Sequence, residues 1–298
     1  MRGLLLIGGL AGLLAAASAL TRPVVAQDDM TYDLRGPAPQ KDQVYQSKTT
    51  LKIKDADTTL KVMGQTLNLK MSMVMTDEEE QKVLAVEGRT VTKCQTKILK
   101  ERAEVTANIG GGPMVEPTAL EGEIIISTRK VDKNGKVTWE HSLLDNKPTE
   151  KQKKELDHRI GMENDDDLYP AEKVKVGHEW TVQASALTKL FGNSFTDIQG
   201  ELKQKFVKIE KVDGADCAVI DSAGTVKGKM KDEEGVPALD VEMDLKIRSW
   251  RDLKTGVEVK STFEGRMKLN GKQKIDDTAV DISLSGPISG ESTAKLKE

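Results

Sequence analysis

The feature that most constrains the fold is the strict alternation of apolar and charged residues over long stretches of the chain. A period of two is typical of a β-strand that packs one face against a core and exposes the other face to water. The pattern recurs over residues 66–76 and 257–269, so an antiparallel, mainly β protein is expected. Its clearest example sets Leu239, Val241, Met243, Leu245 and Ile247 against Asp240, Glu242, Asp244, Lys246 and Arg248.

Composition indicates how such strands are covered. Charged residues make up 31% of the chain and aromatic residues only 3%, so one face of each strand must be strongly solvated and the core must be aliphatic and methionine-rich. Long, meandering hairpins of this kind tend to curl around a shared core. We therefore expect a large curved antiparallel sheet or incomplete barrel, continuous or built from two similar halves, with a short helical insert in mid-chain.

Several local signals predict turns. Asn134-Gly135 and Asn270-Gly271 each predict a tight hairpin, because Asn-Gly tolerates the positive φ that such turns require. The acidic run Asp77–Glu80 follows the alternating stretch over 66–76, and we interpret it as a solvated turn that ends this strand.

Two helices are predicted near the middle of the chain. Thr149 and Gln152 have the spacing of a capping box, which predicts a surface helix over residues 150–160. A second, shorter helix is expected over Ala184–Phe191.

An export signal is predicted over residues 1–26. Arg2 provides a short positive region, Leu4–Leu20 is an apolar run, and Val24-Val25-Ala26 fits a small-residue cleavage site. The alternative is an earlier cut after Ala17-Ser18-Ala19. The apolar run is short and glycine-rich for a membrane span, and no later stretch approaches a spanning length. We expect an exported protein, periplasmic or extracellular, with no integral membrane segment in its mature chain.

The mature chain is expected to consist of two strand-rich parts separated by a connector. The first antiparallel half is predicted over residues 27–147, the helix and connector over 148–180, and the second antiparallel half over 181–298. The strands on the two sides of the connector are similar in style, so the connector is interpreted as a hinge in the architecture.

The connector carries the residues interpreted as a structural anchor. Tyr169-Pro170 favours an extended or turning backbone, because proline fixes φ and pushes the preceding residue out of the helical region. Gly177 suits a position with positive φ, and the turn there would send Trp180 into an apolar layer. The alternative is a loop that grips a ligand through Tyr169, His178 and Trp180.

The two cysteines, Cys94 and Cys217, lie in different halves of the chain. In an oxidising compartment they could form a disulfide, which the chain-entropy model values at about 4 to 5 kcal/mol for so long a loop. The alternative is two separate buried thiols, because free cysteine behaves as a small hydrophobic residue.

Sequence signatures of catalysis and of metal binding are not found. The chain has no Gly-x-Ser-x-Gly elbow, and His141, His158 and His178 lack a metal-ligand spacing. Removing the signal leaves 43 basic residues against 48 acidic ones, a net charge of −5, with no basic stripe for nucleic acid. A non-enzymatic protein without metal or cofactor, and with no nucleic-acid partner, is expected.

Four short segments carry a resemblance to a known family. They are Tyr169-Pro170, Val174-x-Val176-Gly177-x-x-Trp180, Asp252-x-x-Thr255-Gly256 and Tyr32-Asp33-Leu34-Arg35. Together they resemble a family of exported bacterial β-rich proteins of unknown function. The family is similar in architecture to periplasmic lipoprotein-carrier folds, in which helices plug the mouth of a half-open barrel. The resemblance implies binding of an acyl chain or another apolar ligand, and it transfers no site residue.

Two functions remain open on this reasoning. In the first, the protein is a binding or carrier module whose apolar faces line a groove for a lipid or another apolar ligand, because methionine adapts well to varied ligand shapes. In the second, it is a structural or interaction module that meets an envelope protein through its sheet edges or helical insert. The candidate groove residues are Met71, Met73, Met75, Val241 and Met243. The alternative for these residues is a filled core.

Overall fold

The computed structural model describes residues 30–108, 112–183, 186–187, 195–231, 237–275 and 278–297. The export signal predicted over 1–26 lies outside these residues, as does most of the helix predicted over 184–191. Within the described part, the mainly β prediction is confirmed, because its strands form one large antiparallel sheet.

The described part of the chain contains β-strands and a short α-helix, which lies near the middle of the sequence. They are β1 (Val44–Val62), β2 (Gln65–Glu87), β3 (Thr90–Ala107), β4 (Met114–Pro117), β5 (Ile124–Val131), β6 (Val137–Leu143), α1 (Glu150–Asp157), β7 (Glu179–Gln183), β8 (Phe195–Val212), β9 (Ala215–Lys231), β10 (Pro237–Asp252), β11 (Glu258–Ile275) and β12 (Thr278–Lys297).

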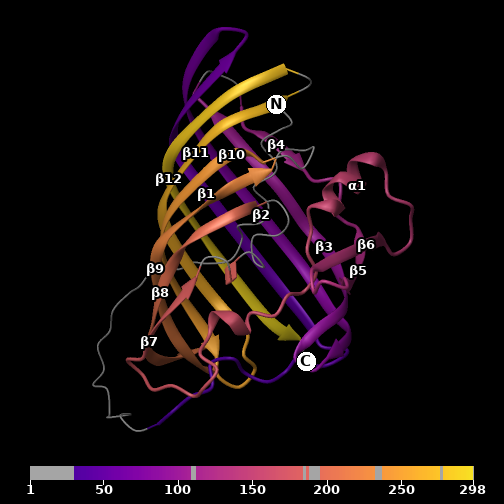
Figure 1. Ribbon diagram of the computed structural model, residues 1–298, viewed down its shortest axis with the longest axis vertical. Coiled ribbons are helices and arrows are strands. Elements are labelled where there is room, and N and C mark those ends of the chain that lie inside the picture. The colour runs from indigo at the N-terminus through magenta and orange to yellow at the C-terminus, as the bar shows by residue number, and fades with distance from the viewer. Residues whose placement is uncertain are drawn as a thin grey trace.

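The first and last strands lie next to each other and join both halves of the chain into one sheet. The strand order is β6-β5-β3-β2-β1-β12-β11-β10-β9-β8-β7, with β4 paired to β3. β1 and β12 pair over almost their whole length, from Val44 opposite Lys297 to Val62 opposite Val280. The sheet curls strongly and leaves β6 and β7 as its two edges, so it is an incomplete barrel (Figure 1).

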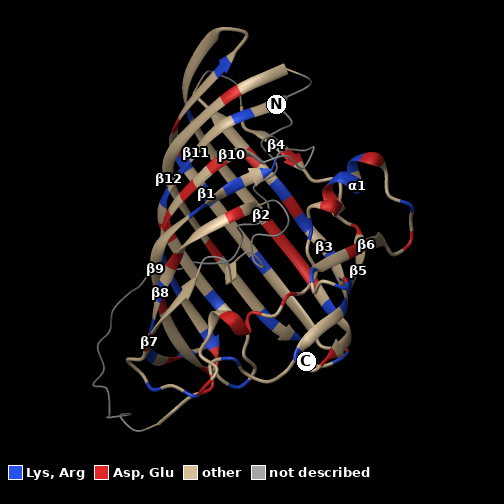
Figure 2. Cartoon of the chain, in the orientation of Figure 1, with Lys and Arg blue, Asp and Glu red and all other residues tan. Residues whose placement is uncertain are grey.

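Alternation along each strand separates the two faces of the sheet. The concave face carries the largest hydrophobic cluster, to which β1, β2 and β7 to β12 all contribute. Charged residues are spread over the strands (Figure 2). On the convex face their side chains pair across neighbouring strands. For example, Glu242 lies 2.8 Å from Lys227 and 3.0 Å from Lys268. The alternating sequence pattern therefore arises from an aliphatic concave face and a solvated convex face.

The acidic run Asp77–Glu80 is not a turn, so that prediction was wrong. β2 continues through it to Glu87, and Asp77 lies opposite Thr49 of β1 and Glu101 of β3. The period of two persists through the run, so Asp77 and Glu79 lie on the same concave face as Met73 and Met75. The strand continues because basic and polar groups from other segments meet these acids, as described below.

One of the two Asn-Gly hairpins is confirmed and the other is wrong. At Asn134-Gly135 the chain turns between β5 and β6, and the Gly135 amide donates to the Asp132 carbonyl oxygen at 3.0 Å. Gly271 instead lies inside β11, opposite Ile282. A Cβ atom there would meet the Ala238 carbonyl oxygen at 2.1 Å, so the glycine serves the close approach of a neighbouring strand.

The predicted capping box is confirmed at the start of α1. The Gln152 amide donates to Thr149 Oγ1, and the Thr149 amide donates to Gln152 Oε1 at 2.9 Å. The helix ends earlier than predicted, with His158 as its C-cap, and it buries Leu156. Arg159 follows the cap, so the end of the helix sets where this side chain enters the sheet.

Candidate functional site

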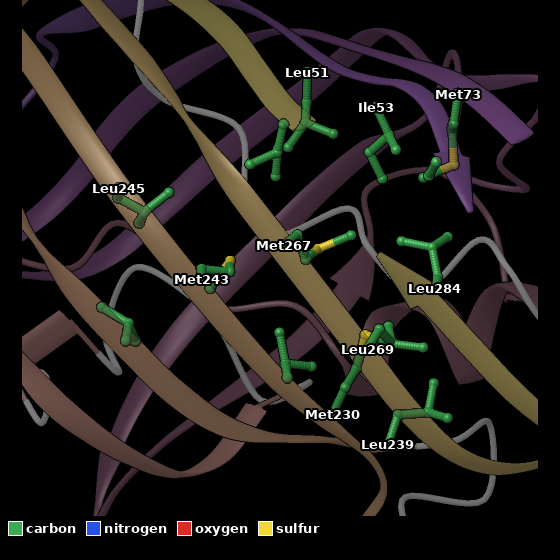
Figure 3. Packing of buried hydrophobic residues seen from close by; sticks show 14 of the residues in the cluster. Leu51, Ile53, Met73, Met230, Leu239, Met243, Leu245, Met267, Leu269 and Leu284 are labelled. Atoms are coloured by element: carbon green, nitrogen blue, oxygen red, sulfur yellow. The ribbon is translucent and has the colours of Figure 1, made fainter. Parts of the chain in front are cut away.

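All five predicted groove residues lie on the concave face and in one hydrophobic cluster. Met71, Met73, Val241 and Met243 are each at most 6% exposed, and Met75 is half-buried against them. Figure 3 shows Met73 projecting into the same interior as Met243 and Met267, which lie opposite each other on the adjacent strands β10 and β11. The structure therefore brings the two predicted groups together, and their burial is also what a filled core would show.

Methionine is concentrated in this cluster. Met71, Met73, Met230, Met243 and Met267 are all buried in it, out of 11 methionines in the chain. An unbranched thioether side chain adapts to irregular shapes at low cost. The concave face is therefore lined by side chains that can repack around a guest.

A row of polar side chains crosses this face at right angles to the strands. Its six members come from six neighbouring strands, and each lies directly opposite the next in the sheet register. They are Ser249 (β10), Ser261 (β11), Ser292 (β12), Thr49 (β1), Asp77 (β2) and Glu101 (β3). We call this set the polar row.

The next two positions on one side of the polar row are apolar on all six strands. The first rank consists of Ile247, Phe263, Gly290, Leu51, Met75 and Ala103, and the second of Leu245, Gly265, Ile288, Ile53, Met73 and Val105. The polar row is therefore a sharp boundary of the apolar cluster.

Most of the polar row is removed from water. Ser261 is 1% exposed, and Ser249 and Thr49 are each 5% exposed. Thr49 Oγ1 and Ser292 Oγ lie 3.1 Å apart and share a hydrogen bond. Hydroxyl groups at this depth lose free energy unless they are hydrogen-bonded.

The row ends in an acidic cluster, which we define as Asp77, Glu79, Glu101 and Glu155. Arg159 enters this cluster from the end of α1, and its guanidinium group donates a hydrogen bond to Glu101. The Thr118 hydroxyl donates to the same carboxylate at 2.7 Å, and the Ala119 amide donates to Glu155 Oε1 at 3.0 Å. Four carboxyl groups thus surround one guanidinium group.

Burial makes ionisation of these acids costly. It raises the pKa of Asp77 well above the usual carboxyl range, and the neighbouring carboxylates of Glu79 and Glu101 raise it further. Burial also raises the pKa of Glu79 and of Glu155. The guanidinium group of Arg159 acts in the opposite direction on all three but does not cancel the effect.

Several buried polar atoms of this region lack a hydrogen-bond partner among the described residues. They are Asp77 Oδ1, Glu155 Oε2 and Gln204 Oε1 on β8, whereas the Ser261 hydroxyl group has the buried Glu258 carboxyl group as its partner. All three atoms can only accept a hydrogen bond when the carboxyl groups are ionised. Unsatisfied buried polar atoms are few in folded proteins, and they point to a bound water molecule, ion or ligand group.

The anchor residues lie at one end of the sheet. Tyr169 is buried, with Pro170 half-buried beside it, and Gly177 has a φ of +91° while its amide donates to the Phe206 carbonyl oxygen at 2.7 Å. Trp180 is half-buried, and its indole N–H donates to the Leu168 carbonyl oxygen at 2.9 Å. These contacts fit the anchor interpretation, and that role stays a prediction.

Arg251 holds the connector against the concave face. It is 2% exposed, and its guanidinium group donates to both carboxylate oxygens of Asp165, at 2.6 and 3.2 Å. It also donates to the carbonyl oxygens of Leu34 and Arg35 and lies 3.9 Å from the centre of the Tyr169 ring. The buried charge is therefore fully paired, which is typical of a structural latch.

Cys94 and Cys217 are separate buried thiols in the structure, the second of the two states that the sequence left open. Cys94 packs with Val83, which lies on the concave face. Cys217 packs with Val219 and Trp250, whose neighbours Ala218 and Arg251 face the concave side. The two thiols therefore lie on opposite faces of the sheet, and no small shift of the backbone joins them.

The sequence reasoning missed the polar row and the acidic cluster. A signal was present, because positions 77, 79, 81 and 83 continue the period of two that begins at Met71. The serines of the row had no such signal, since their alignment depends on the register of strands far apart in the chain.

No group of three or more His, Cys, Asp or Glu side chains in the described part of the chain is arranged to hold a metal ion. The helices that the structure describes include none with the length and apolar character needed to cross a membrane.

Comparisons with known proteins give no family. No protein-family model matches the chain, and no curated protein matches it. The solved structures found in the comparison include an outer membrane channel from Pseudomonas putida F1, with 6% identity over 92% of this chain and 100% of that one and a TM-score of 0.28.

Two further solved structures are a DUF1329 family protein from Desulfovibrio piger and a domain from Vibrio parahaemolyticus assigned as an outer membrane lipoprotein-sorting protein. The first is 9% identical over 85% of this chain and 84% of that one, with a TM-score of 0.14. The second is 10% identical over 85% of both chains, with a TM-score of 0.16. TM-scores this low give no basis for an argument about function.

Proposed function

We propose that this protein is an exported, non-enzymatic binding or carrier module of the cell envelope, which holds a ligand with an apolar chain on the concave face of its sheet. The observation that carries the proposal is the composition of that face. A broad apolar surface rich in methionine is bounded by a straight row of buried polar groups.

A filled core alone does not account for this arrangement. Cores are stable without polar rows, and each buried hydroxyl or carboxyl group without a full set of partners costs free energy. An amphiphilic ligand would account for the polar row. The apolar chain of the ligand would cover the apolar side chains, and its polar end would form hydrogen bonds with the row. Ligand sites are commonly apolar surfaces with a few convergent polar groups.

Native mass spectrometry of protein purified from its own host tests the proposal. We expect an excess mass equal to that of one lipid or other amphiphile, which is released on denaturation. An apo species that also fails to take up amphiphiles added in solution would contradict the carrier function.

Variants separate binding on the concave face from nonspecific uptake. Met243→Gln places a polar amide inside the apolar cluster and is expected to lower ligand retention. Lys268→Gln, on the same pair of strands but on the convex face, is the matched control and is expected to retain the ligand.

The sheet edges support a second candidate, a protein-interaction module. β6 lies at one edge of the sheet, and Val137 in this strand is 37% exposed beside the 56% exposed Val131 of β5. An unpaired strand edge with apolar side chains can accept a strand from a partner. This candidate predicts an apo protein that co-purifies with an envelope protein.

A further inference from the structure

The end of the polar row limits the chemistry of the ligand's polar group. This inference rests on the proposed function, because it assumes that an amphiphile lies on the concave face. The row is uneven, with hydroxyl groups from β10 to β1 and carboxyl groups on β2 and β3. A ligand's head group would therefore meet the strongest field at the acidic cluster.

The charges around the cluster are unbalanced. Arg159 faces Asp77, Glu79 and Glu101, and it is largely buried, with 19% of its side chain exposed. Lys151 lies 3.9 Å from Glu155, but 64% of its side chain is exposed to water. Burial lowers the pKa of the third basic group nearby, His141, so this imidazole gains a positive charge less readily than an exposed histidine. The carboxyl groups of the cluster therefore outnumber the basic groups beside them, and one more positive charge would be stabilised there.

The buried oxygen atoms that lack a hydrogen-bond partner also favour a ligand head group that donates hydrogen bonds. Asp77 Oδ1 and Glu155 Oε2 lie in the cluster, and Gln204 Oε1 is buried elsewhere on the concave side, in a residue that is 9% exposed. Ionised carboxylates and amide oxygens only accept hydrogen bonds. An ammonium group offers three donors and a positive charge, whereas a carboxylate or phosphate group would be repelled.

From this geometry we infer that the acidic cluster receives the ammonium head group of a long-chain amine or amino lipid, while the apolar chain lies on the two apolar ranks beside the polar row. The hydroxyl groups of Thr49 and Ser292 border the same path and suit a head group that also carries hydroxyl groups. The ligand class is therefore a cationic, hydrogen-bond-donating amphiphile.

Three probes with the same chain and different head groups test the inference: tetradecylamine, tetradecanol and tetradecanoic acid. Their affinities are measured at pH 7.5 by displacement of a fluorescent apolar probe. Because charge-assisted hydrogen bonds are about twice as strong as neutral ones, we expect the amine to bind at least about tenfold more tightly than the alcohol. The fatty acid is expected to bind more weakly than both.

Variants connect this preference to the cluster. Asp77→Asn combined with Glu79→Gln keeps the shape of both side chains and removes their charge, and it is expected to bring the affinity ratio between the amine and the alcohol close to one. The control Asp240→Asn combined with Glu242→Gln removes two charges from the convex face and is expected to keep the preference.

The unaltered protein gives a second readout. The raised pKa of Asp77 and Glu79 means that these groups lose their protons at a higher pH than ordinary carboxyl groups. Amine affinity should therefore fall when the pH is lowered through the raised pKa of these groups, while alcohol affinity stays constant.

The outcomes separate the two proposals. Equal affinity for all three probes, or the tightest binding for the fatty acid, overturns the ammonium inference and leaves the carrier function standing. An amine preference that survives in the Asp77→Asn, Glu79→Gln variant also overturns the inference. Binding of none of the probes overturns the carrier function, and the ammonium inference with it.

Discussion

Asp77 lies directly opposite Glu101 in the register of β2 and β3, so two carboxyl groups face each other on the concave side of the sheet. Like charges directly opposite are destabilising in a sheet. Arg159 pairs with Glu101, while Asp77 keeps one oxygen atom without a partner in the described part of the chain. The Asp77–Glu101 pair therefore lowers the free energy of unfolding of the protein.

The cost of this pair is measurable as a pH-dependent effect of Asp77→Asn. The pKa of Asp77 is raised in the folded state, so the folded protein holds this proton at pH values where the unfolded chain has lost it. The resulting stability is present at low pH and is lost as the pH rises through the raised pKa. Asparagine does not incur this loss, so the variant should be more stable than the parent at pH 8 by about 1.4 kcal/mol per unit of pKa shift.

Urea denaturation at pH 8 and pH 4 measures this difference. At pH 4 the parent and Asp77→Asn should differ little, because Asp77 is protonated in the folded parent. Asp281→Asn, which removes a carboxylate on the convex side paired to Lys272 at 3.5 Å, is the control and should stay within about 0.5 kcal/mol of the parent at both pH values. A destabilised Asp77→Asn at pH 8 would show that the carboxylate is fully paired.

Arg251→Lys should be strongly destabilising although it keeps the charge. Lysine cannot donate to both Asp165 oxygens and to the backbone carbonyl oxygens at once, so buried acceptors lose their partners. We expect a loss of about 3 to 5 kcal/mol in the free energy of unfolding, as for a broken buried ion pair.

The control for this change lies on the same strand. Arg248 donates to the two oxygens of Asp221 at 2.6 and 2.7 Å, but 39% of its side chain is exposed. Arg248→Lys is expected to cost less than about 1 kcal/mol, because exposed ion pairs contribute little. Equal losses for both variants in urea denaturation would contradict the latch described for Arg251.

Trp180 offers a test of the anchor interpretation. Its ring is stacked on His178 with centroids 5.9 Å apart, and its N–H group donates to Leu168. Trp180→Phe removes this hydrogen bond and should cost about 1 kcal/mol, whereas Trp180→Ala should cost about 3 kcal/mol, the low end for a large aromatic side chain, because Trp180 is only half-buried. If the alanine variant melts like the parent but loses a bound ligand, the segment is a binding loop.

The fold class was predictable because burial on one face leaves a period-two signal in every long strand. Leu239 to Arg248 alternate without an error, and their strand pairs as this pattern requires. The pairing of β1 with β12 was not predictable, because it joins residues more than 200 positions apart and leaves no local mark on either strand.

The candidate site was only partly predictable for a related reason. The methionines that line the concave face alternate visibly in the sequence, so Met71, Met73 and Met75 were found. Asp77 and Glu79 continue the same alternation, but charged runs usually lie in solvent, and that expectation led to the predicted turn. Their burial depends on Arg159, whose approach to β2 cannot be read from local sequence.

The state of the cysteines gives a last prediction. Cys94 and Cys217 are expected to remain free thiols even in an oxidising compartment, since they lie on opposite faces of the sheet. Burial raises the pKa of Cys94, and burial together with nearby acids such as Asp252 raises that of Cys217 to about 11, so both thiols should react slowly in the folded protein. Alkylation under denaturing conditions should add two labels with or without prior reduction, while native protein should take up neither at neutral pH. Two labels that require a reductant would demonstrate a disulfide and contradict the placement of these residues.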